Sequence, residues 1–170
     1  MNIKLRRLQN SDAEQLAKLA NNKKVWDNVR DLMPHPYGIK DAEFFINLTK
    51  KEDPEVNFAI VRDEELCGVI GLSPQSDVNR LSAELGYWLG EPYWGQGIAT
   101  RAVDLITAYG FEELGMVRIY AGVYEYNLGS MRVLEKNGFV KEGVARMSVI
   151  KNGRMYDEHR YARIGVLGFG

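Results

Sequence analysis

The sequence predicts an α/β protein (α+β in its order of elements) built on one mixed, mostly antiparallel sheet with helices on both faces. Segments with strand periodicity and segments with helical periodicity follow the order β-α-α-α-β-β-β-α-β-α-β-β. The 170 residues contain no repeat, low-complexity tract or linker, and 45% of them are apolar, which is enough for one hydrophobic core. We therefore expect a single domain over residues 1–170.

The first 50 residues are expected to form one strand and three helices. A short strand lies within residues 3–8, and Ser11-Asp-Ala-Glu14 has the spacing of a capping box that begins a helix. A second helical stretch lies near residues 23–31. Two prolines and a glycine within residues 33–38 exclude helix there, and Asp41 then caps the third helix.

The remaining elements follow from apolar periodicity and turn residues. They are strands over residues 58–61, 66–72 and 81–90, a helix over 97–114, a strand over 118–124, a helix over 128–137 and two strands within 139–164. Gly115 and Gly138 follow the two helices, as glycine commonly does at a helix end. Asn152-Gly153 is typical of a two-residue hairpin turn and joins the last two strands.

The charge and cysteine content exclude several classes of protein. The 22 Lys and Arg balance 23 Asp and Glu to a formal net charge of -1, so no overall positive field attracts nucleic acid or an anionic membrane. The single cysteine, Cys67, forms no internal disulfide and no zinc cluster. The first residues lack the pattern of a signal peptide, and no apolar run approaches the ~20 residues that span a bilayer. We expect a soluble, cytoplasmic protein without a metal.

A glycine-rich turn between a strand and a helix is the most informative segment. It runs from Tyr87 to Arg101 and holds Gly95 and Gly97 just before the helix. Glycine lets the backbone approach a ligand closely, and the first N–H groups of a helix lack partners within it, so this turn suits a pyrophosphate. An ordinary strand-to-helix turn has the same pattern. No Walker Gly-Lys-Ser/Thr follows, and Thr100 stands where a dinucleotide fingerprint has its third glycine.

The same turn resembles the pyrophosphate loop of the GCN5-related N-acetyltransferases, the GNAT superfamily. The pattern Gln/Arg-x-x-Gly-x-Gly/Ala is met by Trp94-Gly-Gln-Gly97-Ile-Ala99, with Trp94 in place of Gln or Arg. Residues 92–100 are similar to the RimJ/RimL branch, which acetylates ribosomal-protein N-termini. Residues 127–139 match its Asn-x-x-Ser-x-x-x-x-Glu-Lys-x-Gly-Phe, and residues 152–163 resemble its tail.

The resemblance implies a GNAT fold and direct transfer of an acetyl group from acetyl-CoA to an amine, without a covalent enzyme intermediate. The strands ending at Gly90 and beginning at Arg118 would splay apart around the pantetheine arm. The backbone near Leu89 would pair with that arm and polarise the thioester carbonyl. Asn127 would hydrogen-bond the pantetheine, and Lys136 would reach the nucleotide end. The pyrophosphate would be held by Trp94, Gly95, Gln96, Gly97, Ile98, Ala99 and Thr100.

The catalytic groups are less conventional. Many GNAT members protonate the leaving thiolate with a tyrosine where this chain has Leu134, so Ser130 is the candidate donor, although a serine there also serves to cap a helix. Several N-terminal acetyltransferases carry a glutamate where this chain has Gly122, and Val149 stands at the RimL-type base position. Glu84, on the polar face of its strand, is the remaining candidate base; otherwise it is a solvated carboxylate.

The missing base bears on the acceptor. Deprotonating a lysine side chain at pH 7 costs about 4.6 kcal/mol, whereas an α-amine costs about 1 kcal/mol. We therefore expect a protein or peptide N-terminus as the acceptor. The resemblance implies that Asp157 and Tyr161, in the tail strand, edge the acceptor pocket.

Two other functions stay open. A small-molecule acetyltransferase acting on an aminoglycoside, polyamine or amino sugar would use the same cofactor half, and Asp27 and Asp31 would suit a polycation. A non-catalytic acyl-CoA sensor is the alternative from another class. The protein is expected as a monomer or homodimer, and Trp26, Tyr37 and Phe44 fit either an interface or the core.

Overall fold

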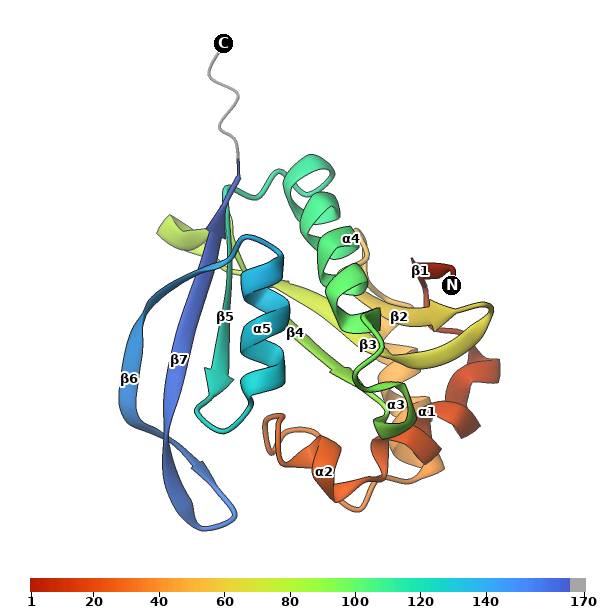
Figure 1. The fold of residues 1–170 in the computed structure, drawn as a ribbon. Coiled ribbons are helices and arrows are strands. Elements are labelled where there is room, and N and C mark those ends of the chain that lie inside the picture. The colour runs from red at the N-terminus through yellow and green to blue at the C-terminus, as the bar shows by residue number, and fades with distance from the viewer. Residues whose placement is uncertain (166–170) are drawn as a thin grey trace. The chain divides into compact units, whose positions relative to one another are not determined.

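A computed structural model describes residues 1–165, and its strands follow one another in the hydrogen-bonded order β1-β2-β3-β4-β5-β7-β6 (Figure 1). The strands are β1 (Ile3–Arg6), β2 (Asn57–Arg62), β3 (Glu65–Pro74), β4 (Ser82–Leu89), β5 (Arg118–Tyr124), β6 (Val140–Lys151) and β7 (Arg154–Ile164). The helices are α1 (Ala13–Ala20), α2 (Lys23–Trp26), α3 (Ile39–Thr49), α4 (Ile98–Glu112) and α5 (Leu128–Lys136), with 3-10 turns at Asn10–Asp12, Asp77–Asn79 and Glu91–Tyr93. This confirms the predicted α/β fold with its mixed sheet.

The chain divides into two compact units, which we describe separately. The first comprises Met1–Gly71 and Tyr87–Ala102, and the second comprises Leu72–Gly86 and the chain from Val103 onward. The boundary therefore falls within β3, β4 and α4. No helix of residues 1–165 combines the length and the apolar character needed to cross a lipid bilayer.

In the first unit, α1 and α3 pack on the antiparallel strands β1, β2 and β3. β1 pairs with β2 from Ile3↔Arg62 to Arg6↔Ala59, and β2 pairs with β3. The core between the helices and strands is formed by Leu8, Ala13, Leu16, Ala20, Tyr37, Ala42, Ile46, Ala59, Val61, Leu66 and Val69. Cys67 is also buried, and burial raises the pKa of its thiol, so this cysteine is a packing residue and a poor nucleophile.

The three aromatic residues that fit either an interface or the core all lie in this unit. Tyr37 belongs to the core, whereas the Phe44 side chain is 67% exposed on α3. The half-buried Trp26 stacks on His35, with the ring centroids 5.6 Å apart, and its Nε1 donates to the Met33 carbonyl at 3.0 Å. Of the three, only Phe44 presents most of its surface to solvent.

The boundaries of two helices in this unit correct two predictions. The capping box of Ser11 and Glu14 is not the one that forms; instead the carboxylate of Asp12 accepts the backbone N–H of Gln9 at 2.7 Å, and α1 begins at Ala13. The second helix ends at Trp26 rather than near residue 31, because the next backbone bonds close shorter, three-residue turns. Asp41 caps α3 as expected, with Oδ2 accepting from Gly38 N at 2.8 Å.

In the second unit, β5 is the central strand and its two faces differ. β5 pairs in parallel with β4 over Ser82–Glu84 and antiparallel with β7 over its whole length. Ile119 points toward α4, where a β-carbon on Gly110 would meet Ile119 Cδ1 at 2.8 Å. α5 covers the same face, because Tyr161, in register beside Ala121, donates to Glu135 of that helix (Figure 1). Alternation along β5 places Tyr120, Gly122 and Tyr124 on the face opposite these helices.

The β6–β7 hairpin forms at the predicted turn. Asn152 and Gly153 have φ values of 53° and 73°, the left-handed geometry that a two-residue hairpin loop requires. A bulge interrupts the register in β6, where Met147 has φ 54° and its N–H donates to Asp157 Oδ1 at 2.9 Å.

Candidate active site

The glycine turn of the first unit is exposed from Trp94 to Gly97 and leads directly into α4. Gly95 and Gly97 have φ values of 71° and 78°, and a β-carbon on either would meet no atom within 4 Å. The glycines are therefore required by backbone conformation and not by lack of space. α4 begins at Ile98, so the N–H groups of its first turn, through Thr100, lie at the positive end of the helix dipole. This arrangement suits the phosphate oxygens of a ligand.

Trp94 connects the glycine turn to the end of β4. Its indole Nε1 donates to the carbonyl oxygen of Leu89 at 2.9 Å. One lone pair of that carbonyl is therefore engaged, and its second lone pair can accept a further hydrogen bond. Trp94 thus links the turn to the strand by a hydrogen bond, at a position where the family pattern has Gln or Arg.

Gln96 ties the turn to a strand that sequence analysis did not associate with it. Its Nε2 donates to Pro92 O at 2.8 Å, and its Oε1 accepts from Arg62 Nη1. The Arg62 guanidinium also lies over the Tyr93 ring, 5.0 Å from its centroid. Arg62 therefore brings a positive charge to the glycine turn. No local pattern reveals it, because it lies 34 residues away in sequence at the end of β2.

The second unit positions Asn127 and Ser130 at the start of α5. Asn127 is the N-cap, and its Oδ1 accepts from Ser130 N at 3.2 Å. Its Nδ2 donates to no group within residues 1–165 and is available to a ligand carbonyl. The cap is thus supplied by Asn127, while the half-buried Ser130 contributes its backbone N–H to it. Leu134, at the family's tyrosine position, is fully buried in the core.

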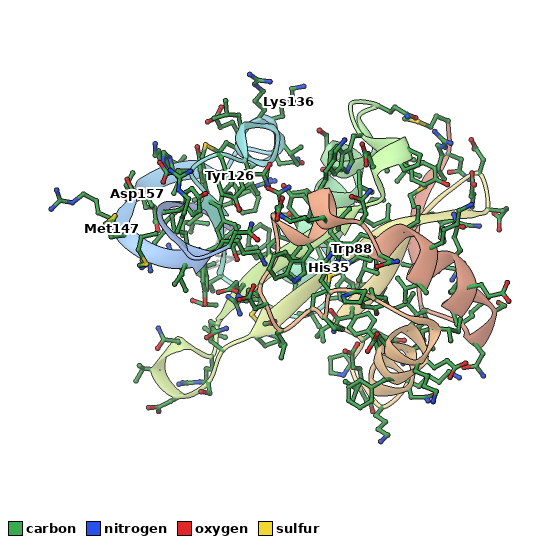
Figure 2. The ribbon with its side chains drawn as sticks, turned by 90° about the horizontal axis from the view of Figure 1, so that it is seen from below. His35, Trp88, Tyr126, Lys136, Met147 and Asp157 are labelled. Atoms are coloured by element: carbon green, nitrogen blue, oxygen red, sulfur yellow. The ribbon has the colours of Figure 1, made fainter. Side chains whose placement is uncertain are left out.

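The other predicted site residues lie in different environments of this unit. Glu84 is half-buried on β4 and stands in register beside Tyr120, on the face opposite the helices. Lys136 is exposed in the last turn of α5 and points outward in Figure 2.

The two tail residues both have intramolecular partners. Asp157 lies beside Met147 in Figure 2, and its carboxylate accepts the Met147 N–H. Its own N–H donates to Glu125 Oε1 at 3.1 Å, and its carbonyl oxygen accepts from Glu125 N at 3.0 Å. Tyr161 is only 2% exposed, and burial together with its hydroxyl's bond to Glu135 at 3.1 Å raises the tyrosine pKa. This placement favours a packing role for Tyr161 between β7 and α5. Acceptor binding remains a prediction for Asp157. Within residues 1–165, no group of three or more His, Cys, Asp or Glu is arranged to hold a metal ion.

Comparison with known proteins agrees with this geometry. Residues 2–140 match the family model of the Acetyltransferase (GNAT) domain. The chain belongs to the GNAT family. The expectation of an N-acetyltransferase with acetyl-CoA as donor is thereby confirmed.

Individual relatives differ in their named acceptors. The probable N-acetyltransferase YjcK of Bacillus subtilis is 41% identical over 123 residues, 72% of this chain and 67% of its own. The ribosomal-protein-serine acetyltransferase of Escherichia coli is 33% identical over 107 residues, 63% of this chain and 59% of its own. The spermidine N(1)-acetyltransferase of the same organism is 30% identical over 158 residues, 89% of this chain and 80% of its own.

Solved structures share the fold over almost the whole chain. Mycobacterium smegmatis RimJ in complex with CoA-disulfide has a TM-score of 0.85 at 23% identity and covers 95% of this chain and 81% of its own. The acetyltransferase MccE in complex with acetyl-CoA and AMP has a TM-score of 0.80 at 27% identity and covers 95% and 92%. The similarity to RimJ and to the ribosomal-protein enzyme agrees with the RimJ/RimL-like resemblance of the sequence.

Proposed function

We propose that the acceptor of this N-acetyltransferase is the α-amine of a protein or peptide N-terminus. The observation that carries the proposal is that an acidic residue which would bind a polycation already forms an ion pair within the protein. Asp27 is already paired with Lys23, with Nζ and Oδ1 2.8 Å apart, within the same helical turn. A polyamine has several ammonium groups and needs several uncommitted carboxylates, whereas an α-amine presents a single charge.

The donor side of the proposal uses the two clusters described above. The N–H groups of residues 94–100 would hold the pyrophosphate of acetyl-CoA, with Arg62 adding charge beside Gln96. Asn127 would donate from Nδ2 to a pantetheine carbonyl, and the exposed Lys136 would contact the nucleotide end. Each of these groups binds or orients the donor without forming a bond to the acetyl group.

The chemistry requires two proton movements and one bond exchange. The acceptor ammonium must lose one proton before its nitrogen attacks the thioester carbon, forming the C–N bond. The C–S bond then breaks, the nitrogen releases a second proton, and the thiolate of CoA ends protonated. Ser130, in the first turn of α5, is the proposed proton donor to the thiolate. A neutral α-amine is available at pH 7 at a cost of about 1 kcal/mol, so a modest base is sufficient.

Acetylation of a small polyamine is the second candidate, favoured by the similarity to the spermidine enzyme over 158 residues. A non-catalytic acyl-CoA sensor is the third. The three candidate functions differ in which acceptor, if any, leads to release of CoA from acetyl-CoA. Neither alternative changes the proposed binding of the donor.

The test measures acetyl-CoA-dependent release of CoA with an acceptor panel. The panel contains peptides with free Ala, Ser or Met N-termini, the same peptides with blocked N-termini, spermidine, an aminoglycoside and an amino sugar, each against a blank without acceptor. Release with the free peptides and none with the blocked ones supports the proposal. Release with small amines alone overturns it in favour of the second candidate. Tight binding of acetyl-CoA without release by any acceptor favours the sensor.

A further inference from the structure

Glu158 of β7 fills the space above Gly122 of β5. The two strands are antiparallel, with Gly122 beside Arg160 and Tyr124 beside Glu158. A β-carbon on Gly122 would lie 2.5 Å from Glu158 Cδ and 2.7 Å from each carboxylate oxygen. The carboxyl group of Glu158 therefore stands where a side chain at position 122 would begin, and only glycine permits it.

The surroundings of Glu158 leave room for a ligand. Its side chain lies on the sheet face opposite α4 and α5, since β5 alternates and Tyr161 contacts α5 from the other face. On β6 its neighbours across the strand are Ala145 and Gly143, and a β-carbon on Gly143 would meet no atom within 4 Å. Gly122, Gly143 and Ala145 are thus small neighbours of the carboxylate, while Tyr124 lies beside Glu158 in register on β5.

The Glu158 carboxylate is largely shielded from solvent and accepts only one long hydrogen bond within the described residues. The side chain is 24% exposed, and its one hydrogen bond within residues 1–165 comes from Arg160 Nε at 3.4 Å, longer than a normal N–H···O bond. Placing a charged group in a covered position is unfavourable unless partners compensate it. Since the fold gives Glu158 little compensation, the geometry favours a ligand that supplies a cation or a proton.

β5 offers such a ligand access at this point. The ladder between β4 and β5 ends at Glu84↔Tyr120, while β5 continues to Tyr124. Glu158 lies over this continuing part of β5. Glu84 lies at the end of the ladder and already interacts with another group of the protein.

We propose that Glu158 is the group that binds the acceptor ammonium and removes its proton. The inference rests on the proposed N-acetyltransferase function and assigns its base to Glu158 instead of Glu84. One N–H bond of the ammonium breaks, and the proton moves to a carboxylate oxygen of Glu158. The neutral nitrogen forms the C–N bond, the C–S bond breaks, and the second proton ends on the CoA thiolate. Glu158 returns its proton to water.

A pH profile of this site must take the neighbouring groups into account. The charged and titratable groups on this face are Arg154, Tyr156 and Arg160 of β7, Arg118, Tyr120 and Tyr124 of β5, Glu84 of β4, and Glu142 of β6, which is bound to Arg118. Of these, only Arg160 forms a hydrogen bond with the Glu158 side chain. A change confined to the Glu158→Gln variant therefore identifies Glu158 as its source.

The first variant is Glu158→Gln, which keeps the shape and removes the base. Using whichever amine the wild type acetylates best, we expect kcat to fall by about 10²- to 10⁴-fold and KM for acetyl-CoA to stay within about twofold. We also expect the deficit of the variant to shrink as the pH rises through the pKa of the acceptor amine, because an amine that is already neutral needs no base. Glu142→Gln is the matched control. Glu142 carries a carboxylate on the same hairpin, which is bound by Arg118, and we expect its substitution to keep kcat within about twofold.

Gly122→Ala provides a second, independent perturbation. Its new methyl group displaces the flexible end of Glu158 without touching the carboxylate's chemistry. We expect a folded protein with lowered kcat, and no further loss when Gly122→Ala is added to Glu158→Gln, because both changes act through one group. Additive losses would overturn the assignment.

The outcomes separate this inference from the proposed function. A Glu158→Gln variant that keeps full kcat and the wild-type pH profile overturns the role of Glu158 and leaves the function standing. A wild type that acetylates only small amines overturns the peptide acceptor, while the Glu158 variants are then tested on those amines. A wild type that acetylates nothing overturns both.

Discussion

The indole nitrogen of Trp94 donates a hydrogen bond of 2.9 Å to the carbonyl oxygen of Leu89. This bond closes the glycine turn over the end of β4 and fixes the direction in which the turn enters α4. A Gln or Arg at the same position would reach the carbonyl through a flexible chain, whereas the indole ring is rigid and loses less conformational entropy when it is held.

Replacing Trp94 by Phe removes the N–H donor and keeps an aromatic ring. We expect KM for acetyl-CoA to rise about fivefold and the free energy of unfolding to fall by about 1 kcal/mol, the usual net value of one hydrogen bond. Steady-state kinetics and urea denaturation measure the two effects. Trp26→Phe is the control: its indole bonds to Met33 O at 3.0 Å, so stability should fall without a change in KM for acetyl-CoA. An unchanged KM in Trp94→Phe would contradict the role of this bond.

Gly97→Ala tests whether the turn must be left-handed to bind the donor. An L residue at a φ of 78° costs about 1–2 kcal/mol, although the added methyl group meets no atom. We expect a loss of that size in stability and a rise of about tenfold in the dissociation constant of acetyl-CoA, measured by calorimetry. Gly115→Ala, at a φ of 67° and equally free of contacts, is the control that loses the same stability and keeps the affinity. If Gly97→Ala binds acetyl-CoA as tightly as Gly115→Ala does, the left-handed turn contributes to stability and not to binding of the donor.

The residues predicted well from sequence are those whose geometry depends on near neighbours. β5 runs from Arg118 to Tyr124 as predicted, because its alternating pattern is uninterrupted. Gly138, with φ 78°, ends α5, and Asn152-Gly153 turns the hairpin, since both depend only on local backbone conformation. The glycine turn before α4 belongs to the same class.

The residues that sequence analysis missed act across strands. Arg62 reaches Gln96 from 34 residues away, and Glu158 reaches Gly122 from the neighbouring strand. Their meeting depends on strand order and register, which one sequence does not specify. The capping error has a related cause: Ser11 and Glu14 have the right spacing, but Arg6 holds Asp12 where it takes the Gln9 N–H first.

Asn127 combines a helix cap with a proposed ligand contact, and two substitutions separate these roles. Asn127→Asp keeps an oxygen for Ser130 N and removes the Nδ2 donor. We expect its free energy of unfolding to stay within about 0.5 kcal/mol and KM for acetyl-CoA to rise about tenfold. Asn127→Ala loses both functions and about 1 kcal/mol of stability as well. If Asn127→Asp binds acetyl-CoA like the wild type in the same calorimetric assay, Nδ2 does not contact the donor.

The ion pair of Arg6 and Asp12 makes the stability of the first unit depend on pH. Asp12 is only 6% exposed, and the two terminal guanidinium nitrogens of Arg6 donate to its carboxylate, at 2.8 and 2.9 Å. Burial by itself would raise the pKa of Asp12, but the hydrogen bonds from Arg6 and from Gln9 N outweigh it, and the folded-state pKa lies below the ordinary value of 3.8.

Because the folded-state pKa is lowered, the stabilisation by Asp12 is complete above the unfolded-state pKa and is lost as the pH falls through the folded-state value. We expect Asp12→Asn to lower the free energy of unfolding by about 1.5–3 kcal/mol at pH 7. As the pH falls below the ordinary pKa of 3.8 the wild type should lose this advantage, so that the two stability curves converge in acid. Urea denaturation at a series of pH values measures both curves. Curves that stay parallel down to pH 2 would mean that Asp12 has the same pKa in the folded and unfolded chain.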